Sequence, residues 1–141
     1  MTQEEKQLLL KDLSTRLPYG VKIKRSNCPI NLSVTGILGE YVHHIPYYVG
    51  GNIEINTTKI DEVKPYLRPM LSMTEKEKLQ LIHYAIIGDG HIAGVDFVDW
   101  VERKNVPSYI DWLNAHYFDY RGLIPMGLAL EAPEDMYKIN N

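Results

Sequence analysis

The first stretch of the chain spaces its apolar residues as an amphipathic helix does. Those on one face are Leu9, Leu10, Leu13 and Leu17. Thr2 and Glu5 have the spacing of a capping box, in which each side chain accepts a hydrogen bond from a free backbone N–H of the first turn. Pro18 disfavours helix in the residue before it. We therefore predict a helix over residues 3–17.

The next part of the chain alternates apolar and polar residues with a period of two, which is typical of half-buried strands. Such runs occupy residues 21–24, 32–35 and 53–56. Glycines separate the runs and indicate turns or bulges: Gly36, Gly39, Gly50 and Gly51. This pattern predicts an antiparallel meander or small open barrel. Because residues 60–70 contain two prolines, we expect a helical turn and then an extended linker there.

Helical spacing returns in the second half of the chain. Thr74 and Glu77 form a second capping box, which opens a predicted helix ending near Ile87. Two more helices are predicted at about 94–105 and 107–116, and the tail after Tyr117 reads as a strand or an irregular strap. We therefore predict a single α+β domain over 1–141, with an N-terminal helix, a small antiparallel sheet and a helical C-terminal half packed on it.

Composition narrows the class of protein. The chain has 141 residues, 45% of them hydrophobic and 23% charged, which is ordinary for a globular domain. A net charge of −3 argues against a nucleic-acid partner, because nucleic-acid binding normally needs a basic surplus. Cys28 is the only cysteine, so no intrachain disulfide forms. The sequence holds no long apolar run, and its acidic N-terminus is unlike a signal peptide. We expect a cytoplasmic protein without membrane contact.

A glycine motif at residues 84–94 resembles the dinucleotide-binding fingerprint. Gly88, Gly90 and Ala93 match G-x-G-x-x-A, but that motif requires a strand before its first glycine. Here the preceding residues predict a helix, so we favour a glycine-rich connection between two helices. A DNA-binding helix-turn-helix over the same region is disfavoured, because Asp96 and its acidic neighbours would repel phosphates.

Histidines and serines offer no catalytic or metal-binding pattern. The histidines are His43, His44, His83, His91 and His116, and none has the H-x-x-x-H spacing of a helical metal site. Adjacent histidines on a strand point to opposite faces, and no serine lies in a G-x-S-x-G elbow. We therefore predict no metal, no cofactor and no catalytic residue. A hydrolase with carboxylates assembled in space is the least favoured function.

The segment HYFDYRG, residues 116–122, is the best candidate for a protein-binding surface. Aromatic residues and arginine are enriched in binding hot spots, and the candidate residues are His116, Tyr117, Asp119, Tyr120 and Arg121. The alternative is structural: Phe118 and Tyr120 cap the core while Asp119 and Arg121 pair locally. One question for the fold is whether Tyr47, Tyr48, Tyr117 and Tyr120 form one exposed patch; a self-complementary patch would favour a homo-oligomer.

Three stretches of the sequence resemble a group of uncharacterised small proteins from gut anaerobes and their phages or mobile elements. They are residues 1–23, 64–75 (KPYLRPMLSMTE) and 111–133 (DWLNAHYFDYRGLIPMGLALEAP). The resemblance implies a mobile-element setting and an SH3-like barrel over residues 21–69, closed by the KPYLRP turn. It implies no activity.

Two functions remain after these exclusions. A non-enzymatic binding or accessory protein with an unidentified protein partner is favoured. The alternative is a small-molecule binder that sequesters a signalling nucleotide, which the mobile-element resemblance suggests. Its candidate residues are a basic strand and the glycine loop: Lys22, Lys24, Arg25, Gly88 and Gly90.

Overall fold

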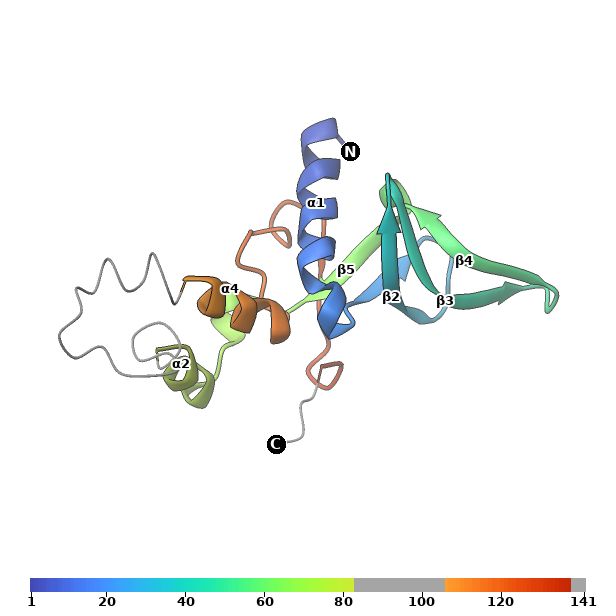
Figure 1. Cartoon of the computed structure of the whole chain (residues 1–141). Coiled ribbons are helices and arrows are strands. Elements are labelled where there is room, and N and C mark those ends of the chain that lie inside the picture. Colours follow the sequence, from blue (N-terminus) through green and yellow to red (C-terminus); the bar gives the residue numbers. More distant parts are fainter. Residues whose placement is uncertain (83–105, 138–141) are drawn as a thin grey trace.

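The computed structural model describes residues 1–82 and 106–137 (Figure 1). Its α-helices are α1 (Gln3–Arg16), α2 (Glu75–Ile82) and α4 (Val106–Ala115). Its strands are β1 (Lys22–Arg25), β2 (Asn31–Leu38), β3 (Tyr41–Val49), β4 (Ile53–Lys59), β5 (Val63–Leu67) and β6 (Leu130–Glu131). Short 3-10 turns lie between them: η1 (Leu17–Tyr19), η2 (Ile60–Glu62) and η3 (Met70–Ser72).

Helix α1 forms as its sequence predicts. Thr2 and Glu5 exchange backbone-to-side-chain hydrogen bonds of 2.8 and 3.0 Å, which completes the capping box. The helix ends at Arg16, one residue before the predicted end, and the chain continues into η1 with Pro18 in it. Leu9 and Leu13 are fully buried on its inner face. The helix lies against the sheet on one side and near α4 on the other (Figure 1).

Within the described residues, the sheet has six strands in the order β4-β3-β2-β1-β5-β6. Every neighbouring pair is antiparallel except β5 with β6. The order leaves β4 and β6 as edges, yet Arg25 at the end of β1 donates to the Thr58 hydroxyl on β4 at 2.9 Å. Two strands separate β1 from β4, so this bond requires a strongly curled sheet. The predicted N-terminal helix and antiparallel sheet are confirmed.

The prediction of a linker over residues 60–70 is wrong in its second half. The helical turn is present as η2, but Val63–Leu67 form strand β5, which pairs with both β1 and β6. Proline removes a backbone donor, and this argued against a strand inside a sheet. Because β6 pairs only with Tyr66 and Leu67, one side of β5 is open at Pro65, where no donor is required.

The second half is less regular than the predicted helical half. Helix α2 begins with the expected capping box, in which Thr74 and Glu77 are joined by bonds of 3.0 and 3.1 Å. Helix α4 matches the predicted helix at 107–116 to within a residue. The predicted helix at 94–105, and the end of the one before it, lie outside the described residues. Residues 116–137 form turns with the short strand β6, which agrees with the predicted strap.

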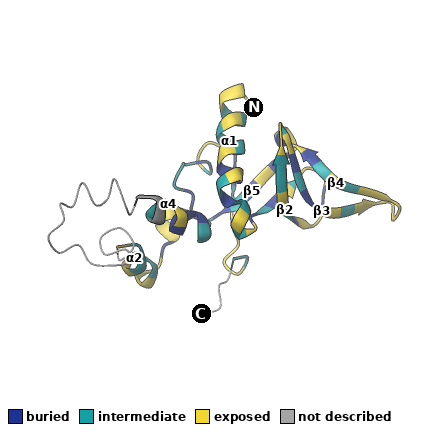
Figure 2. Cartoon of the chain, viewed as in Figure 1, coloured by how far each residue is buried: buried dark blue, intermediate teal, exposed yellow. Residues whose placement is uncertain are grey.

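Two groups of buried side chains form the core. The larger joins α1 to the sheet and to the C-terminal segment, and includes Leu9, Leu13, Ile23, Leu32, Val42, Leu67 and Leu123. The smaller lies under α4 and consists of Met73, Trp112, Leu113 and Phe118. Figure 2 shows that the outer part of the β3–β4 hairpin, unlike its base, is largely exposed.

Candidate functional site

The candidate segment 116–122 begins where α4 ends in a Schellman turn. The Phe118 N–H donates to the Leu113 carbonyl at 3.0 Å and the Tyr117 N–H to the Asn114 carbonyl at 3.1 Å. Tyr117 has φ of +63°, a left-handed conformation that usually selects glycine. Its side chain compensates: the ring stacks on Tyr137 with centroids 3.7 Å apart, and the hydroxyl donates to the Tyr19 carbonyl.

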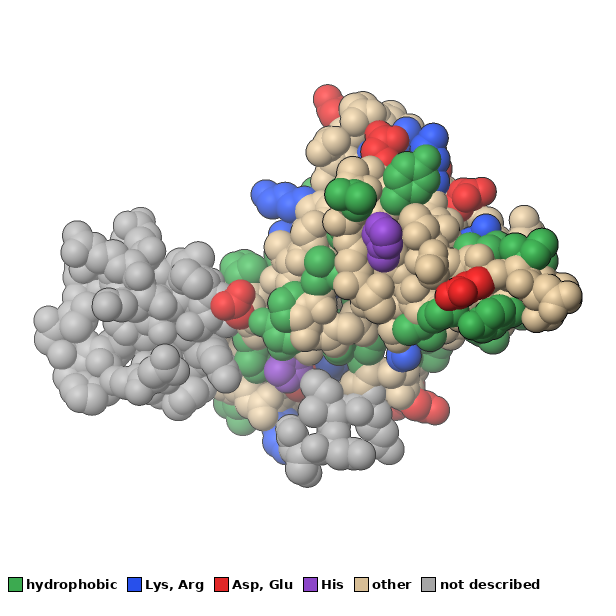
Figure 3. Space-filling view, turned by 45° about the vertical axis from the view of Figure 1, so that its right-hand side comes forward, with side chains coloured by type: hydrophobic (Ala, Val, Ile, Leu, Met, Phe, Trp, Pro, Cys, Tyr) green, Lys and Arg blue, Asp and Glu red, His purple; other side chains and the backbone are tan. Residues whose placement is uncertain are grey.

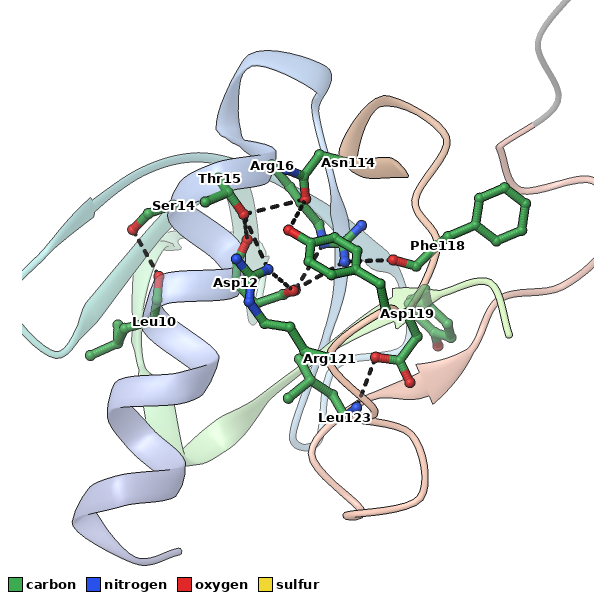
Figure 4. Close-up of polar contacts among 12 residues, drawn as sticks. Leu10, Asp12, Ser14, Thr15, Arg16, Asn114, Phe118, Asp119, Arg121 and Leu123 are labelled. Atoms are coloured by element: carbon green, nitrogen blue, oxygen red, sulfur yellow. Dashed lines mark hydrogen bonds and ion pairs between the residues drawn. The ribbon is translucent and has the colours of Figure 1, made fainter. Parts of the chain in front are cut away.

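Arg121 extends from this segment into a buried charge network on α1 (Figure 4). The Asp12 carboxylate accepts two hydrogen bonds from Arg16, at 2.9 and 3.0 Å, and one from Arg121 at 2.7 Å. Arg16 also donates to the Phe118 carbonyl at 2.7 Å. Asp12 and Arg16 expose none of their surface. The buried Asp12 carboxylate is therefore the hydrogen-bond acceptor and counter-charge for two guanidinium groups, those of Arg16 and Arg121, which are far apart in the sequence.

The other residues of the segment complete this network. The Tyr120 hydroxyl donates to the Asn114 side chain at 2.9 Å, and the Arg121 guanidinium lies 4.6 Å from the centre of the Tyr120 ring. The Asp119 carboxylate accepts the N–H groups of Leu123 and Ile124 at 2.8 and 2.9 Å. Asp119 thus caps the following turn and does not pair with Arg121, contrary to the local ion pair considered from the sequence.

These contacts give the predicted site residues internal partners. Phe118 is fully buried, as the structural alternative expected, and Asp119 is 7% exposed. Tyr117, Tyr120 and Arg121 are half-buried. The sequence could not reveal this role, because the partner of Arg121 is 109 residues away. Partner binding by this segment stays a prediction.

His116 faces a different environment, a cleft of about 590 Å³. Its ring stacks on Trp112 with centroids 3.9 Å apart, and its Nδ1 lies 2.9 Å from the Trp112 carbonyl oxygen. The cleft lies between η3, α2 and the chain after β6, and its charged or ionisable lining residues are Arg68, Lys76, Glu77, His116, Glu131, Glu134 and Tyr137. The lining mixes both signs of charge and so favours no single ligand charge.

Arg68 and Glu77 form the strongest ion pair of this cleft. Two hydrogen bonds of 2.7 Å join the guanidinium to the carboxylate, and Arg68 also lies over the Phe118 ring at 4.1 Å. Partial burial raises the pKa of Glu77, but the hydrogen bonds from Arg68 and Thr74 outweigh it and hold that pKa at about 2. The pair fastens the start of α2 to the end of the sheet.

This pair gives a pH-dependent prediction. In the folded protein the pKa of Glu77 lies below its usual value of 4.5. The ionised carboxylate therefore contributes its full stabilisation of the fold above pH 4.5, and this contribution is lost as the pH falls toward 2. We expect Glu77→Gln to lower the free energy of unfolding by about 1–2 kcal/mol at neutral pH. Denaturant titrations of the variant and the natural protein should converge as the pH falls through that window.

Glu75→Gln is the matched control, because Glu75 pairs with Lys78 at 3.1 Å on the same helix but is 87% exposed. Exposed pairs contribute little, so this change should stay within about 0.5 kcal/mol. A gap between Glu77→Gln and the natural protein that stays constant with pH would contradict the assignment.

The basic strand does not present its three cations together. Lys22 and Lys24 alternate with the buried Ile23, so they point away from the core, and the Lys22 ammonium lies 3.3 Å from the Ser33 hydroxyl. Arg25 points to the other face and bonds to Thr58. Gly88 and Gly90 lie outside the described residues. Small-molecule binding by this group stays a prediction.

An exposed apolar surface lies on the β3–β4 hairpin, which projects from the rest of the molecule (Figure 1). Ile53 is 64% exposed, Tyr48 57%, and Ile45 and Val49 41% each. The cross-strand pairs are Tyr47 with Ile55 and Val49 with Ile53. Directly paired residues point to the same face, so the side chains of these two pairs form one apolar face of the hairpin.

Figure 3 shows hydrophobic side chains gathered around this projecting end, with an acidic side chain among them. The four tyrosines considered from the sequence do not form one patch. Tyr48 is exposed on one face of the hairpin and Tyr47 is half-buried on the other, packed against the larger core group, while Tyr117 and Tyr120 belong to the internal network. The period of two over residues 53–56 was the available signal for the hairpin, but it does not reveal which face the rest of the chain covers.

Comparisons with protein-family models, curated proteins and solved structures find no match for this chain. None of the described helices combines the length and the apolar character needed to cross a membrane. Within the described ranges, no three His, Cys, Asp or Glu side chains gather closely enough to hold a metal ion.

Proposed function

We propose that this protein is a non-enzymatic binding or accessory protein, and that it contacts a protein partner through the β3–β4 hairpin. One observation supports the proposal above the others: the hairpin projects into solvent while carrying an apolar face made of Tyr47, Val49, Ile53 and Ile55. Water contact of a contiguous apolar surface is unfavourable, and such surfaces mark interaction sites in folded proteins.

The hairpin has the features of a binding element. Its two strands are held by pairs from Tyr41–Lys59 to Val49–Ile53, which orders the backbone before a partner arrives. On the opposite face of the hairpin, exposed Tyr48 pairs with Glu54 and offers a large ring with few rotatable bonds, a property common in binding hot spots. A second group of exposed apolar side chains lies on η3 and α2: Met70, Leu71, Leu79 and Ile82. Its last member directly precedes residue 83 in the sequence, where the described residues stop.

The fold around the hairpin supports a finer assignment. We propose that β1–β5 form an SH3-like barrel, as the resemblance to small mobile-element proteins implies. In support, β1 pairs with both β2 and β5, a 3-10 turn separates β4 from β5, and the sheet curls until Arg25 reaches Thr58. A mobile-element setting, in which small proteins bind host factors, is part of the same proposal.

Site-specific photocrosslinking tests the binding surface. A benzophenone amino acid at position 49, on the apolar face of the hairpin, is expected to form adducts with a partner in cells of the encoding organism. The same group at Ile30, which is 46% exposed but outside the hairpin, provides the matched control. We expect adducts only from position 49, and their loss when Ile53 and Ile55 are both changed to Glu, since charge opposes burial of that face.

Mass spectrometry of the adduct identifies the partner, which is either a different protein or a second copy of this chain. Either result supports protein binding at the hairpin. Equal labelling from positions 49 and 30, or no protein adduct from position 49, would contradict it.

A further inference from the structure

Strand β4 is a free sheet edge. It lies at the end of the strand order, so the backbone groups on its outer side have no partner strand within the described part of the chain. Its seven residues, IEINTTK, contain no proline. Between the pairs His43–Thr57 and Tyr47–Ile55 the register shifts, so that three residues of β3, His44 to Pro46, lie opposite Asn56 alone on β4. The extra residues are therefore on β3, and β4 runs without a bulge.

Edge strands normally carry a device that blocks further pairing, such as a proline, a bulge or a central lysine. The opposite edge is protected because β6 has only two residues. In β4 the sole basic residue, Lys59, is at the end of the strand, and the centre is Ile55, Asn56 and Thr57. Beside this open edge lies the apolar hairpin face, so a strand added to β4 would also extend a hydrophobic surface.

We propose that the occupant of this edge is a second copy of the chain, paired antiparallel through β4 about a two-fold axis at Ile55. The inference rests on the proposed function, since it names a partner for the same hairpin. A two-fold axis perpendicular to a sheet places a residue opposite its own copy and its neighbours opposite each other, so within β4 the axis can pass through Glu54, Ile55, Asn56 or Thr57.

Charge and polarity select among these registers. An axis at Glu54 sets two glutamates against each other, which is destabilising. An axis at Asn56 sets Ile53 against Lys59, and an axis at Thr57 sets Ile55 against Lys59. An axis at Ile55 sets Ile55 against Ile55, Ile53 against Thr57 and Glu54 against the amide of Asn56. No like charges meet, and the apolar hairpin faces of both copies join into one surface. Self-complementarity of this kind fits an isologous dimer.

Sedimentation velocity of the purified full chain tests the dimer. We expect a species of twice the 16.3 kDa chain mass that dissociates on dilution. Ile55→Lys and Ile55→Glu should each give monomers, because like charges meet at the axis, whereas an equimolar mixture of the two should restore the dimer. Leu38→Lys, at a 72% exposed position outside β4, is the control and should leave the dimer unchanged.

Cysteine substitution supplies a readout that tolerates some loss of stability. The paired Cβ atoms at the axis lie close enough for a disulfide, so Ile55→Cys should crosslink two chains under mild oxidation. Ile53→Cys, four residues from its own copy across the axis, should not. A natural protein that stays monomeric at all concentrations, or a dimer unaffected by both Ile55 charge variants, would overturn the proposal. A monomer that still yields position-49 adducts with another protein would leave the proposed function standing.

Discussion

Asp12→Asn is expected to lower the free energy of unfolding by about 3–5 kcal/mol, the largest loss from any single polar substitution considered for this chain. Asp12 is fully buried and accepts hydrogen bonds from both Arg16 and Arg121. The asparagine is close in size but uncharged, so it leaves two guanidinium groups in a desolvated site without a counter-charge. Chemical denaturation with matched baselines measures the change.

Asp61→Asn is the matched control for the loss of an acidic group. Asp61, in η2, pairs with Lys6 of α1 at 3.5 Å, but the Asp61 side chain is 39% exposed. Solvent screens such a pair, and we expect a change of less than about 1 kcal/mol. If Asp12→Asn cost no more than Asp61→Asn, the buried network would not hold the C-terminal segment to α1.

Phe118→Ala should cost about 3–5 kcal/mol. The side chain is fully buried in the smaller core group, where its ring stacks on Trp112 at 5.9 Å and lies beneath the Arg68 guanidinium at 4.1 Å. Truncation removes the apolar contacts of the ring and leaves a cavity that the Schellman turn cannot close, because its backbone bonds fix the chain there. Thermal and chemical unfolding both report this loss.

Met126→Ala controls for truncation of a large apolar residue in the same C-terminal segment. Met126 is 46% exposed, so its removal should change stability by less than about 0.5 kcal/mol. A Phe118→Ala variant as stable as Met126→Ala would contradict the placement of residue 118 in the core.

Both predictions bear on how the segment 116–122 is understood. Its aromatic and charged residues suggested a binding surface, since the same residue types supply binding hot spots and buried polar networks. The structure gives them internal contacts: Arg121 reaches Asp12, and the Asp119 carboxylate accepts two backbone N–H groups. The exposed apolar surface lies instead on the hairpin, about seventy residues earlier in the chain.

The features that the sequence determined by itself are those set by neighbouring residues. Both capping boxes join residues three positions apart, so their hydrogen bonds could be predicted directly from Thr2, Glu5, Thr74 and Glu77. The helix α4 and the strands β1, β2 and β4 follow from periods of 3.6 and two, which reflect backbone geometry, whereas β3 lies outside the predicted runs.

Only the tertiary structure decided the features that depend on distant residues. A strand containing Pro65 became part of the sheet because β1 and β6 supply its neighbours. Arg121 became part of a buried charge network because Asp12 lies across the fold. Likewise, the period of two marks Ile53 and Ile55 as one face of a strand, but whether that face is covered depends on where α1 packs. Burial is a property of the whole fold, whereas local pattern records only the backbone's repeat.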